Sequence, residues 1–270
     1  MNRLIPGLAL IIGWLLLLLS GSFLLFFPVL VLVLLIGAME YTRMAFPEKT
    51  IAFRLLFGLL ALLPALGSGW FSAPGLAGGL LLSFLLLTCH IFYHYNRLQE
   101  PLHFFSRAFF GVIYVGFLGA HLLLLHQLPE GSSWILVLTA ITAGSDSGAY
   151  YCGRRFGKHK LCPQISPNKT IEGAIGGLVV GVAVAVLMVI LLRLQVSWFF
   201  LVPVAVLLTG VGIAGDLTES IIKRATGSKD SGTLLAGHGG VLDRVDSLLF
   251  AAPVLYYLLL CSQAVSLVAS

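Results

Sequence analysis

Charged residues are scarce in this chain of 270 residues, where only 10% of positions are charged and 59% are hydrophobic. Soluble domains carry about 25% charged residues, so the composition excludes an ordinary soluble fold. The mean hydropathy of +1.01 indicates a polytopic membrane protein, for which lipid is the solvent of most of the surface. The formal net charge of +5 fits membrane topology and anionic lipid or phosphate ligands better than nucleic acid.

Motifs of several enzyme classes are also missing. The four cysteines form no CxxC pair, so we expect free thiols rather than a zinc site or a disulfide framework. The sequence has no P-loop, no GxSxG nucleophile elbow and no HExxH zinc motif. Any chemistry must therefore come from the polar clusters that interrupt the apolar runs.

Long apolar runs fill most of the sequence. A helix needs about 20 apolar residues to cross the hydrocarbon, so we expect an all-α protein with about nine transmembrane helices. Their approximate positions are 4–20, 23–41, 55–72, 75–95, 108–126, 133–152, 174–192, 198–219 and 246–265. Glycines at small-residue spacing predict close helix packing at Gly75, Gly78, Gly79, Gly173, Gly176, Gly177 and Gly181.

The basic residues indicate the orientation. If the N-terminus lies in the cytoplasm, every Lys and Arg except Arg193 falls on the cytoplasmic side, where such residues accumulate. We therefore expect a cytoplasmic N-terminus and a location in the cell (inner) membrane. The two most basic loops, 153–173 and 220–246, then share the cytoplasmic face, and we expect the active site there.

The acidic residues divide the chain unevenly. Seven of the eleven lie in the C-terminal half. We therefore expect N-terminal scaffold helices in residues 1–130 and a catalytic region in residues 131–270. Glu40, in the first region, is expected to pair with Arg43 or to face lipid headgroups.

A first polar cluster lies at the cytoplasmic end of the eighth span. On a helix, one face carries four of its residues, Asp216, Glu219, Ser220 and Lys223. A charge in hydrocarbon costs from about 2.5 to more than 10 kcal/mol, so the carboxylates need a partner, water or an ion. An interhelical salt bridge with Lys223 or Arg224 is the structural alternative to a site.

A second cluster joins a glycine-rich loop to the ninth span. Asp243 and Asp246 share a face of the first helical turns, where carboxylates also favour the helix dipole. If spans eight and nine are neighbours, Asp216 and Asp243 can bracket a cation such as Mg²⁺, with phosphates completing its shell. Glycines let backbone N–H groups approach phosphate. His238 is then a phosphate contact, a proton carrier or a structural loop residue.

A third cluster runs from the sixth span into a basic loop. Its polar members include Asp146, Tyr150, Arg154, Lys158, Ser166, Lys169, Thr170 and Glu172. Arginine binds phosphate as a planar fork and lysine as a point charge. Ordinary basic loops rarely combine Gly, Ser-Pro and Lys-Thr so closely, although a loop that only sets topology is the simpler alternative.

Two stretches closely resemble the phosphatidate cytidylyltransferases, also called CDP-diacylglycerol synthases. The first contains Ser220, Lys223-Arg224, Lys229-Asp230, Gly232, His238-Gly239-Gly240, Asp243-Arg244 and Asp246. The second runs from Asp146-Ser147-Gly148 through Gly153-Arg154 and Ser166-Pro167-Asn168-Lys169-Thr170 to Glu172-Gly173. One position departs, because Ala236 stands where the family usually has Pro or Gly. The N-terminal spans resemble the family only in hydropathy.

The resemblance implies that CTP and phosphatidic acid give CDP-diacylglycerol and pyrophosphate, with Mg²⁺ and a second cation such as K⁺. It implies Asp216 and Asp243 as metal ligands, with Asp246 and Glu219 beside them. Lys223 and His238 would join Asp216 and Asp243 as catalytic residues. The implied substrate-binding residues are Asp146, Tyr150, Arg154, Lys158, Ser166, Lys169, Thr170, Glu172, Ser220, Arg224, Lys229, Asp230, Gly239, Gly240 and Arg244.

Two other functions compete with this one. A CTP-dependent polyprenol or phytol kinase would transfer the γ-phosphate to a lipid alcohol and release CDP. An ion-coupled transporter would use Asp146, Asp216 and Glu219 as a relay, but such sites lie near the bilayer midplane rather than at one face. Expected partners are CTP, phosphatidic acid and the bilayer; a homodimer is compatible with the family, and nucleic acid is not expected.

Overall fold

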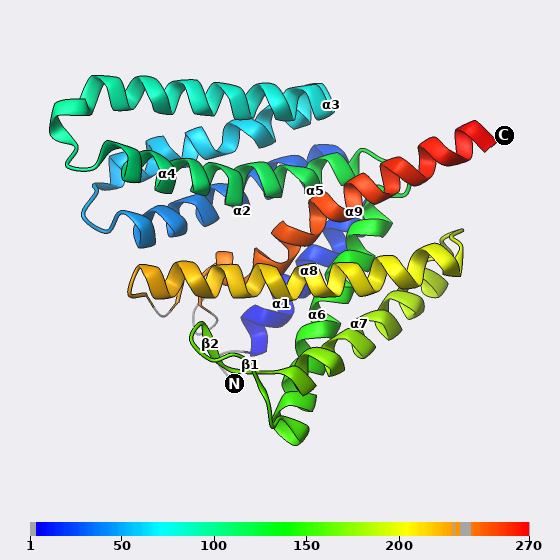
Figure 1. The fold of residues 1–270 in the computed structure, drawn as a ribbon. Coiled ribbons are helices and arrows are strands. Elements are labelled where there is room, and N and C mark those ends of the chain that lie inside the picture. Colours follow the sequence, from blue (N-terminus) through cyan, green and yellow to red (C-terminus); the bar gives the residue numbers. More distant parts are fainter. Residues whose placement is uncertain (1–3, 229, 233–238, 270) are drawn as a thin grey trace.

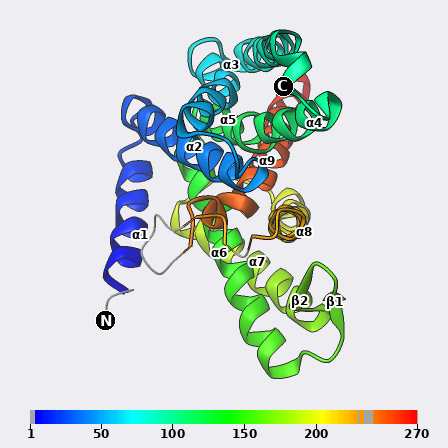
Figure 2. The same cartoon turned by 90° about the vertical axis from the view of Figure 1, so that its left-hand side faces the viewer.

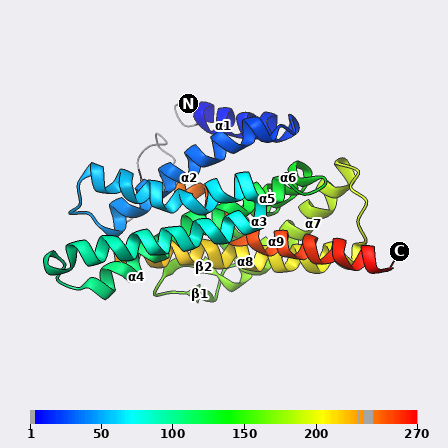
Figure 3. The ribbon, with the colours of Figure 1, turned by 90° about the horizontal axis from the view of Figure 1, so that it is seen from above.

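The computed structural model describes residues 4–228, 230–232 and 239–269. These residues form a bundle of helices with a β-hairpin at its edge (Figure 1). Most of the helices run side by side along one direction, as the view from above shows (Figure 3). The architecture confirms the all-α prediction in its main part.

Two helices joined by a tight turn begin the chain. α1 (Leu4–Leu19) and α2 (Phe23–Ala45) meet at Gly21, whose φ of 62° favours glycine. The two helices pack through Trp14 and Phe26, with ring centroids 5.9 Å apart. Phe26 is fully buried, so this contact belongs to the core.

α3 (Ile51–His94) consists of two antiparallel arms. Its backbone leaves the helical region at Phe71 and Ser72, and the chain reverses there (Figure 1). Gly67 and Gly75 touch across the arms, where a Cβ on either would overlap the other's backbone. The third and fourth predicted spans are these two arms. The predicted close packing is present at Gly75 and Gly79, whereas nothing described lies within 4 Å of a Cβ at Gly78.

The next span combines several short helical elements. After η1 (Tyr95–Arg97), the chain forms α4 (Pro101–Gly111), the π-helical segment η2 (Val112–Phe117) and α5 (Leu118–His126). Tyr114 in η2 is among the largest fully buried side chains. Gly116 lies directly against the backbone of α3, which a larger residue would push away.

An arm that carries the β-hairpin follows. It contains α6 (Gly131–Phe156), β1 (Lys160–Cys162), β2 (Ser166–Thr170) and α7 (Ile171–Leu191). The strands are antiparallel, with Lys160 opposite Thr170, and Figure 2 shows this arm projecting beyond the rest of the bundle. Thr170 Oγ1 also accepts the Gly173 N–H at 3.1 Å and so caps α7. The sequence analysis treated this region as a loop and did not predict the strands.

The last two helices, α8 (Trp198–Ala225) and α9 (Leu242–Ala269), are close neighbours. A Cβ at Gly215 would lie 2.7 Å from the carbonyl oxygen of Asp246. The Ser247 hydroxyl donates to the Gly212 carbonyl at 3.1 Å. Spans eight and nine are therefore adjacent, as the predicted two-carboxylate site requires.

Six segments of the described chain are long and apolar enough to cross a membrane. They are Phe23–Ala45, Ile51–Arg97, Pro101–His126, Ile171–Leu191, Trp198–Ala225 and Leu242–Ser262. The second of these contains both arms of α3. The shorter α1 is apolar over Gly7–Leu19, and α6 is not among the six. The chain is thus a multi-pass membrane protein, while the count of nine spans stays a prediction.

The turns of the bundle gather at two ends. The Ser72 hydroxyl donates to Gln127 Oε1 at 2.8 Å, which ties the reversal in α3 to the turn before α6. Figure 1 places the turn between α2 and α3 and the C-terminal end of α8 at the other end. This alternation is the one expected of successive spans.

Candidate active site

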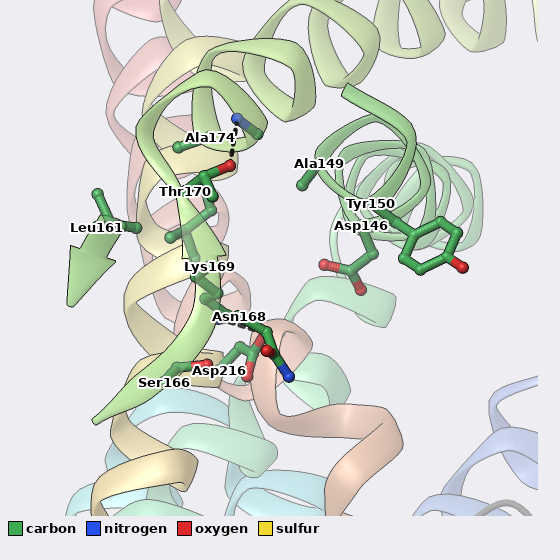
Figure 4. Close-up of a pocket in the computed structure, with 12 residues that line it drawn as sticks. Asp146, Ala149, Tyr150, Leu161, Ser166, Asn168, Lys169, Thr170, Ala174 and Asp216 are labelled. Atoms are coloured by element: carbon green, nitrogen blue, oxygen red, sulfur yellow. Dashed lines mark hydrogen bonds and ion pairs between the residues drawn. The ribbon is translucent and has the colours of Figure 1, made fainter. Parts of the chain in front are cut away.

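A cavity of about 320 Å³ lies between α6, the β-hairpin, α7 and α8. Figure 4 shows the Asp146 carboxylate directed toward β2, while the ring of Tyr150 points away from it. The predicted site residues that line the cavity are Asp146, Tyr150, Ser166, Lys169, Thr170 and Asp216. Asn168 also lines it, although the sequence analysis did not select this residue. The first and third polar clusters therefore meet in one place.

An ion pair joins the two walls of this cavity. Lys169 Nζ on β2 lies 2.5 Å from Asp216 Oδ2 on α8. Asp216 also interacts electrostatically with Asp146 and Asp246, and Arg244 with Asp146. The cavity is thus lined by one carboxylate from α6, one from α8 and the Lys169 ammonium group, and Asp246 and Arg244 of α9 act on these carboxylates electrostatically.

A second charged group lies between α8 and α9. Lys223 Nζ is 2.5 Å from Glu219 Oε2 and 2.8 Å from Asp243 Oδ1. Lys223 thus pairs with Glu219 within α8, whereas the predicted alternative was a bridge between helices, and its interhelical partner is Asp243 of the second cluster. Only 1% of the Glu219 side chain is exposed, and its Oε1 has no hydrogen-bond partner among the described residues. Lys223 therefore offsets one of the two negative charges, while one buried oxygen of Glu219 stays unsatisfied.

The backbone of the glycine-rich loop also binds Asp243. Asp243 Oδ2 accepts the Gly240 N–H at 2.8 Å and the Ser231 N–H at 3.3 Å. Gly239 has a φ of 79°, and a Cβ there would lie 2.6 Å from the same oxygen. The Gly240 N–H is therefore used within the loop, whereas the sequence analysis assigned it to phosphate.

Asp246 lies one turn further along α9 and is 8% exposed. Its Oδ1 accepts the N–H of the adjacent Ser247 at 2.6 Å. Asp216, Asp146 and Lys223 interact with it electrostatically. Asp246 therefore lies within electrostatic range of the two carboxylates that line the cavity.

Other predicted residues shape the β-hairpin. Glu172 accepts the N–H groups of Lys158 and His159, and His159 Nδ1 lies 2.6 Å from Glu172 Oε1. Arg224 Nε donates to the Ile165 carbonyl at 3.3 Å and ties α8 to the hairpin turn. In this structure Glu172 fixes the start of the hairpin and Arg224 fixes its tip.

Several predicted residues lie away from the cavity or outside the described chain. Arg154 contacts Tyr150 at the exposed end of α6, with 3.3 Å between Nη1 and the phenolic oxygen. Asp230 is exposed, and Ser220 is half-buried. Lys229 and His238 lie outside the described residues.

Glu40 does not have the partners predicted from the sequence. This residue is buried near the end of α2 and accepts the N–H groups of Val241 and Leu242 at 3.0 and 2.8 Å. It therefore contacts the start of α9 rather than Arg43 or headgroups. One feature of the sequence could have indicated such a contact: a carboxylate in an otherwise apolar helix needs a buried partner.

The oxygen donors of the site fit a hard divalent cation. Within the described residues, no group of three or more His, Cys, Asp or Glu side chains is arranged to hold a metal ion. Mg²⁺, however, is usually held by one or two carboxylates while substrate phosphates complete its shell. The unsatisfied Glu219 Oε1, beside Asp243, leaves a donor of the required kind in place. Binding of Mg²⁺ here stays a prediction.

Comparison with known proteins gives one consistent match. The model of the cytidylyltransferase family matches residues 1–262. The phosphatidate cytidylyltransferase of Bacillus subtilis (strain 168) is 34% identical over 269 residues, covering 96% of this chain and 97% of the relative. That of Staphylococcus haemolyticus (strain JCSC1435) is 36% identical over 258 residues, covering 94% and 96%. The similarity therefore extends over the N-terminal helices as well as the polar clusters.

Proposed function

This chain belongs to the cytidylyltransferase family, and we propose that it performs the family's reaction at the cavity between β2 and α8. Its activity is that of a phosphatidate cytidylyltransferase, which converts CTP and phosphatidate to CDP-diacylglycerol and pyrophosphate. The observation that carries the site assignment is the Lys169–Asp216 ion pair. It brings a basic and an acidic residue from separate clusters to the wall of one cavity.

The position of the cavity suits two substrates from different phases. Phosphatidate is a lipid and reaches the protein through the bilayer, whereas CTP arrives from water. The β-hairpin and the first turn of α7 line the cavity, in the arm that projects in Figure 2, and the apolar side chains of Ile175 and Val179 on α7 are exposed. An apolar route for acyl chains therefore lies beside the charged groups that suit phosphates.

The reaction forms a bond between a phosphatidate oxygen and the α-phosphorus of CTP while the bond to pyrophosphate breaks. In such transfers the protein mainly positions the groups and neutralises their charge. In this proposal Lys169 contacts phosphate oxygens inside the cavity, and Lys223 and Arg224 contact them from the adjoining part of α8. Mg²⁺, when bound by Asp216 and Asp243 with Asp246 and Glu219 beside them, would add positive charge for the triphosphate.

In the structure, both lysines are paired with carboxylates. Phosphate binding then requires an exchange of partners, in which Lys169 and Lys223 turn from carboxylate to phosphate oxygens. Both side chains keep part of their surface exposed, 25% and 18%. The pairing therefore holds the lysines beside the site without closing it.

We place the active site on the cytoplasmic side, with the N-terminus in the cytoplasm. The support is the gathering of the basic segments at one end of the bundle, because cytoplasmic loops carry the excess of Lys and Arg. CTP is a cytoplasmic nucleotide, so this orientation also brings the substrate to the correct face.

The deciding experiment follows the α-phosphate of CTP. Purified protein in detergent is incubated with phosphatidic acid, Mg²⁺ and CTP labelled at the α-phosphate, and the label should move into an organic-extractable CDP-lipid. A lipid kinase would leave that label in aqueous CDP and transfer label from γ-labelled CTP instead. If folded protein did neither, the cytidylyl-transfer assignment would fail and ion transport would become the next hypothesis.

A further inference from the structure

Glu40 is a buried carboxylate far from the C-terminal clusters in sequence but next to them in space. It accepts the Val241 N–H at 3.0 Å and the Leu242 N–H at 2.8 Å. Leu242 begins α9, and the first N–H groups of a helix have no partner within it. Glu40 lies on α2, 202 residues before Leu242 in the sequence, and it therefore caps α9 from a distant helix.

Ser231 connects Glu40 to the charged group between α8 and α9. Its hydroxyl donates to Glu40 Oε2 at 3.5 Å and accepts the Asp243 N–H at 3.3 Å. Its own N–H donates to Asp243 Oδ2, which also accepts the Gly240 N–H. Glu40 and Asp243 thus hold two edges of the loop between α8 and α9. One edge is Ser231, and the other is Gly240 with Val241.

Glu40 also explains why two positions of this loop are glycine. A Cβ at Gly232 would overlap the Glu40 side chain, which supplies its three nearest atoms. A Cβ at Gly240 would overlap Ser231 Oγ and lie 2.6 Å from Glu40 Oε2. Only glycine therefore lets both edges of the loop close on this carboxylate.

We infer that Glu40 is a positioning residue for cytidylyl transfer. It fixes Ser231 and the first turn of α9, and these in turn keep Asp243 beside Lys223. The inference rests on the proposed function, because Asp243 and Lys223 are the groups assigned there to metal and phosphate. It also gives a helix of the predicted scaffold a part in the active site.

The first test compares the steady-state kinetics of Glu40→Gln, Glu40→Asp and wild-type protein. Glutamine keeps the shape but replaces one of the two acceptor oxygens with an NH₂ group, which then faces the N–H of either Val241 or Leu242. We therefore expect kcat to fall about ten-fold or more while KM for CTP changes less than about three-fold. Glu40→Asp keeps the charge and should restore part of kcat.

Glu48→Gln is the matched control, because Glu48 is exposed just after α2. It removes the same charge and should leave kcat unchanged. The wild-type protein is assayed first, so an inactive wild type counts against the proposed function and not against Glu40. Full kcat in folded Glu40→Gln would overturn the inference.

A second test separates this contact from general destabilisation. Gly232→Ala should lower activity, because its Cβ overlaps the Glu40 carboxyl group. Adding Glu40→Asp withdraws that group by one methylene and should raise activity about three-fold or more over Gly232→Ala alone. General destabilisation would make the double variant worse than either single variant, which would overturn the inference. If Glu40→Gln does not fold, this second test decides.

Discussion

Lys169 on β2 and Asp216 on α8 face each other across the candidate site, with 2.5 Å between Nζ and Oδ2. They come from separate polar clusters, and their side chains are only partly exposed, at 25% and 32%. Each residue can therefore exchange the other for a substrate phosphate or a cation. We interpret the ion pair as the arrangement of the site before its ligands bind.

Removing either partner of this pair should slow the reaction. We expect Asp216→Asn to lower kcat about 100-fold or more, because it removes a carboxylate assigned to Mg²⁺. Lys169→Met should lower it about ten-fold or more, because a phosphate contact is lost. Initial rates of CDP-diacylglycerol formation in both single variants and the double variant give the coupling free energy between Lys169 and Asp216. Strictly additive losses would contradict the shared site, because residues in contact are normally coupled.

Asp243→Asn should abolish turnover and leave folded protein in the membrane. The substitution removes the charge that faces Lys223 and weakens the acceptor of two loop N–H groups. Activity is measured together with the size-exclusion profile of the purified variant. The control is Glu100→Gln, which lies on an exposed turn. Near wild-type activity of Asp243→Asn would refute its assignment to the metal.

Removal of divalent cations should stop the reaction reversibly. Activity is expected to disappear in excess EDTA and to return when Mg²⁺ is added, because the triphosphate charge needs a hard cation. Asp216→Asn should then require a higher Mg²⁺ concentration for half-maximal activity, which a titration of its residual rate measures. Undiminished activity in EDTA would exclude the predicted metal dependence.

Topology can be tested at the end of α9. With nine spans and a cytoplasmic N-terminus, a reporter fused after Ser270 should lie outside the cytoplasm. Paired fusions to alkaline phosphatase, active outside, and to a fluorescent protein, fluorescent inside, give opposite signals. A cytoplasmic result would mean that the number of spans differs from nine by an odd number.

The reversal in α3 provides a stability test with an internal control. Gly75→Ala should destabilise the protein by about 1–3 kcal/mol, because its Cβ overlaps the backbone of Gly67. Gly78 lies in the same arm with nothing described within 4 Å of its Cβ position. Gly78→Ala should therefore be neutral or stabilise by up to about 1 kcal/mol. Thermal unfolding in detergent compares the two, and equal midpoints would exclude the close contact between the arms.

Sequence spacing correctly indicated parts of the candidate site that lie on one element or on adjacent elements. Asp216, Glu219 and Lys223 share a helix face because the 3.6-residue period places them there. The same reasoning could not show which carboxylate Lys223 would bind, since that depends on how α9 packs against α8. It also missed the β-hairpin, whose strands contain only three and five residues, too short for a periodic signal.

Hydropathy and charge in the sequence alone were enough to establish a multi-pass helical membrane protein and to predict that its chemistry lies in the C-terminal half. Transfer of a segment into lipid depends on its own composition, so local sequence determines it. Contacts such as Glu40 with Leu242, or Lys169 with Asp216, depend on close packing between helices that are distant in the chain. No local pattern encodes such a pairing, and only the tertiary structure brought a carboxylate of the predicted scaffold to the loop that carries the site.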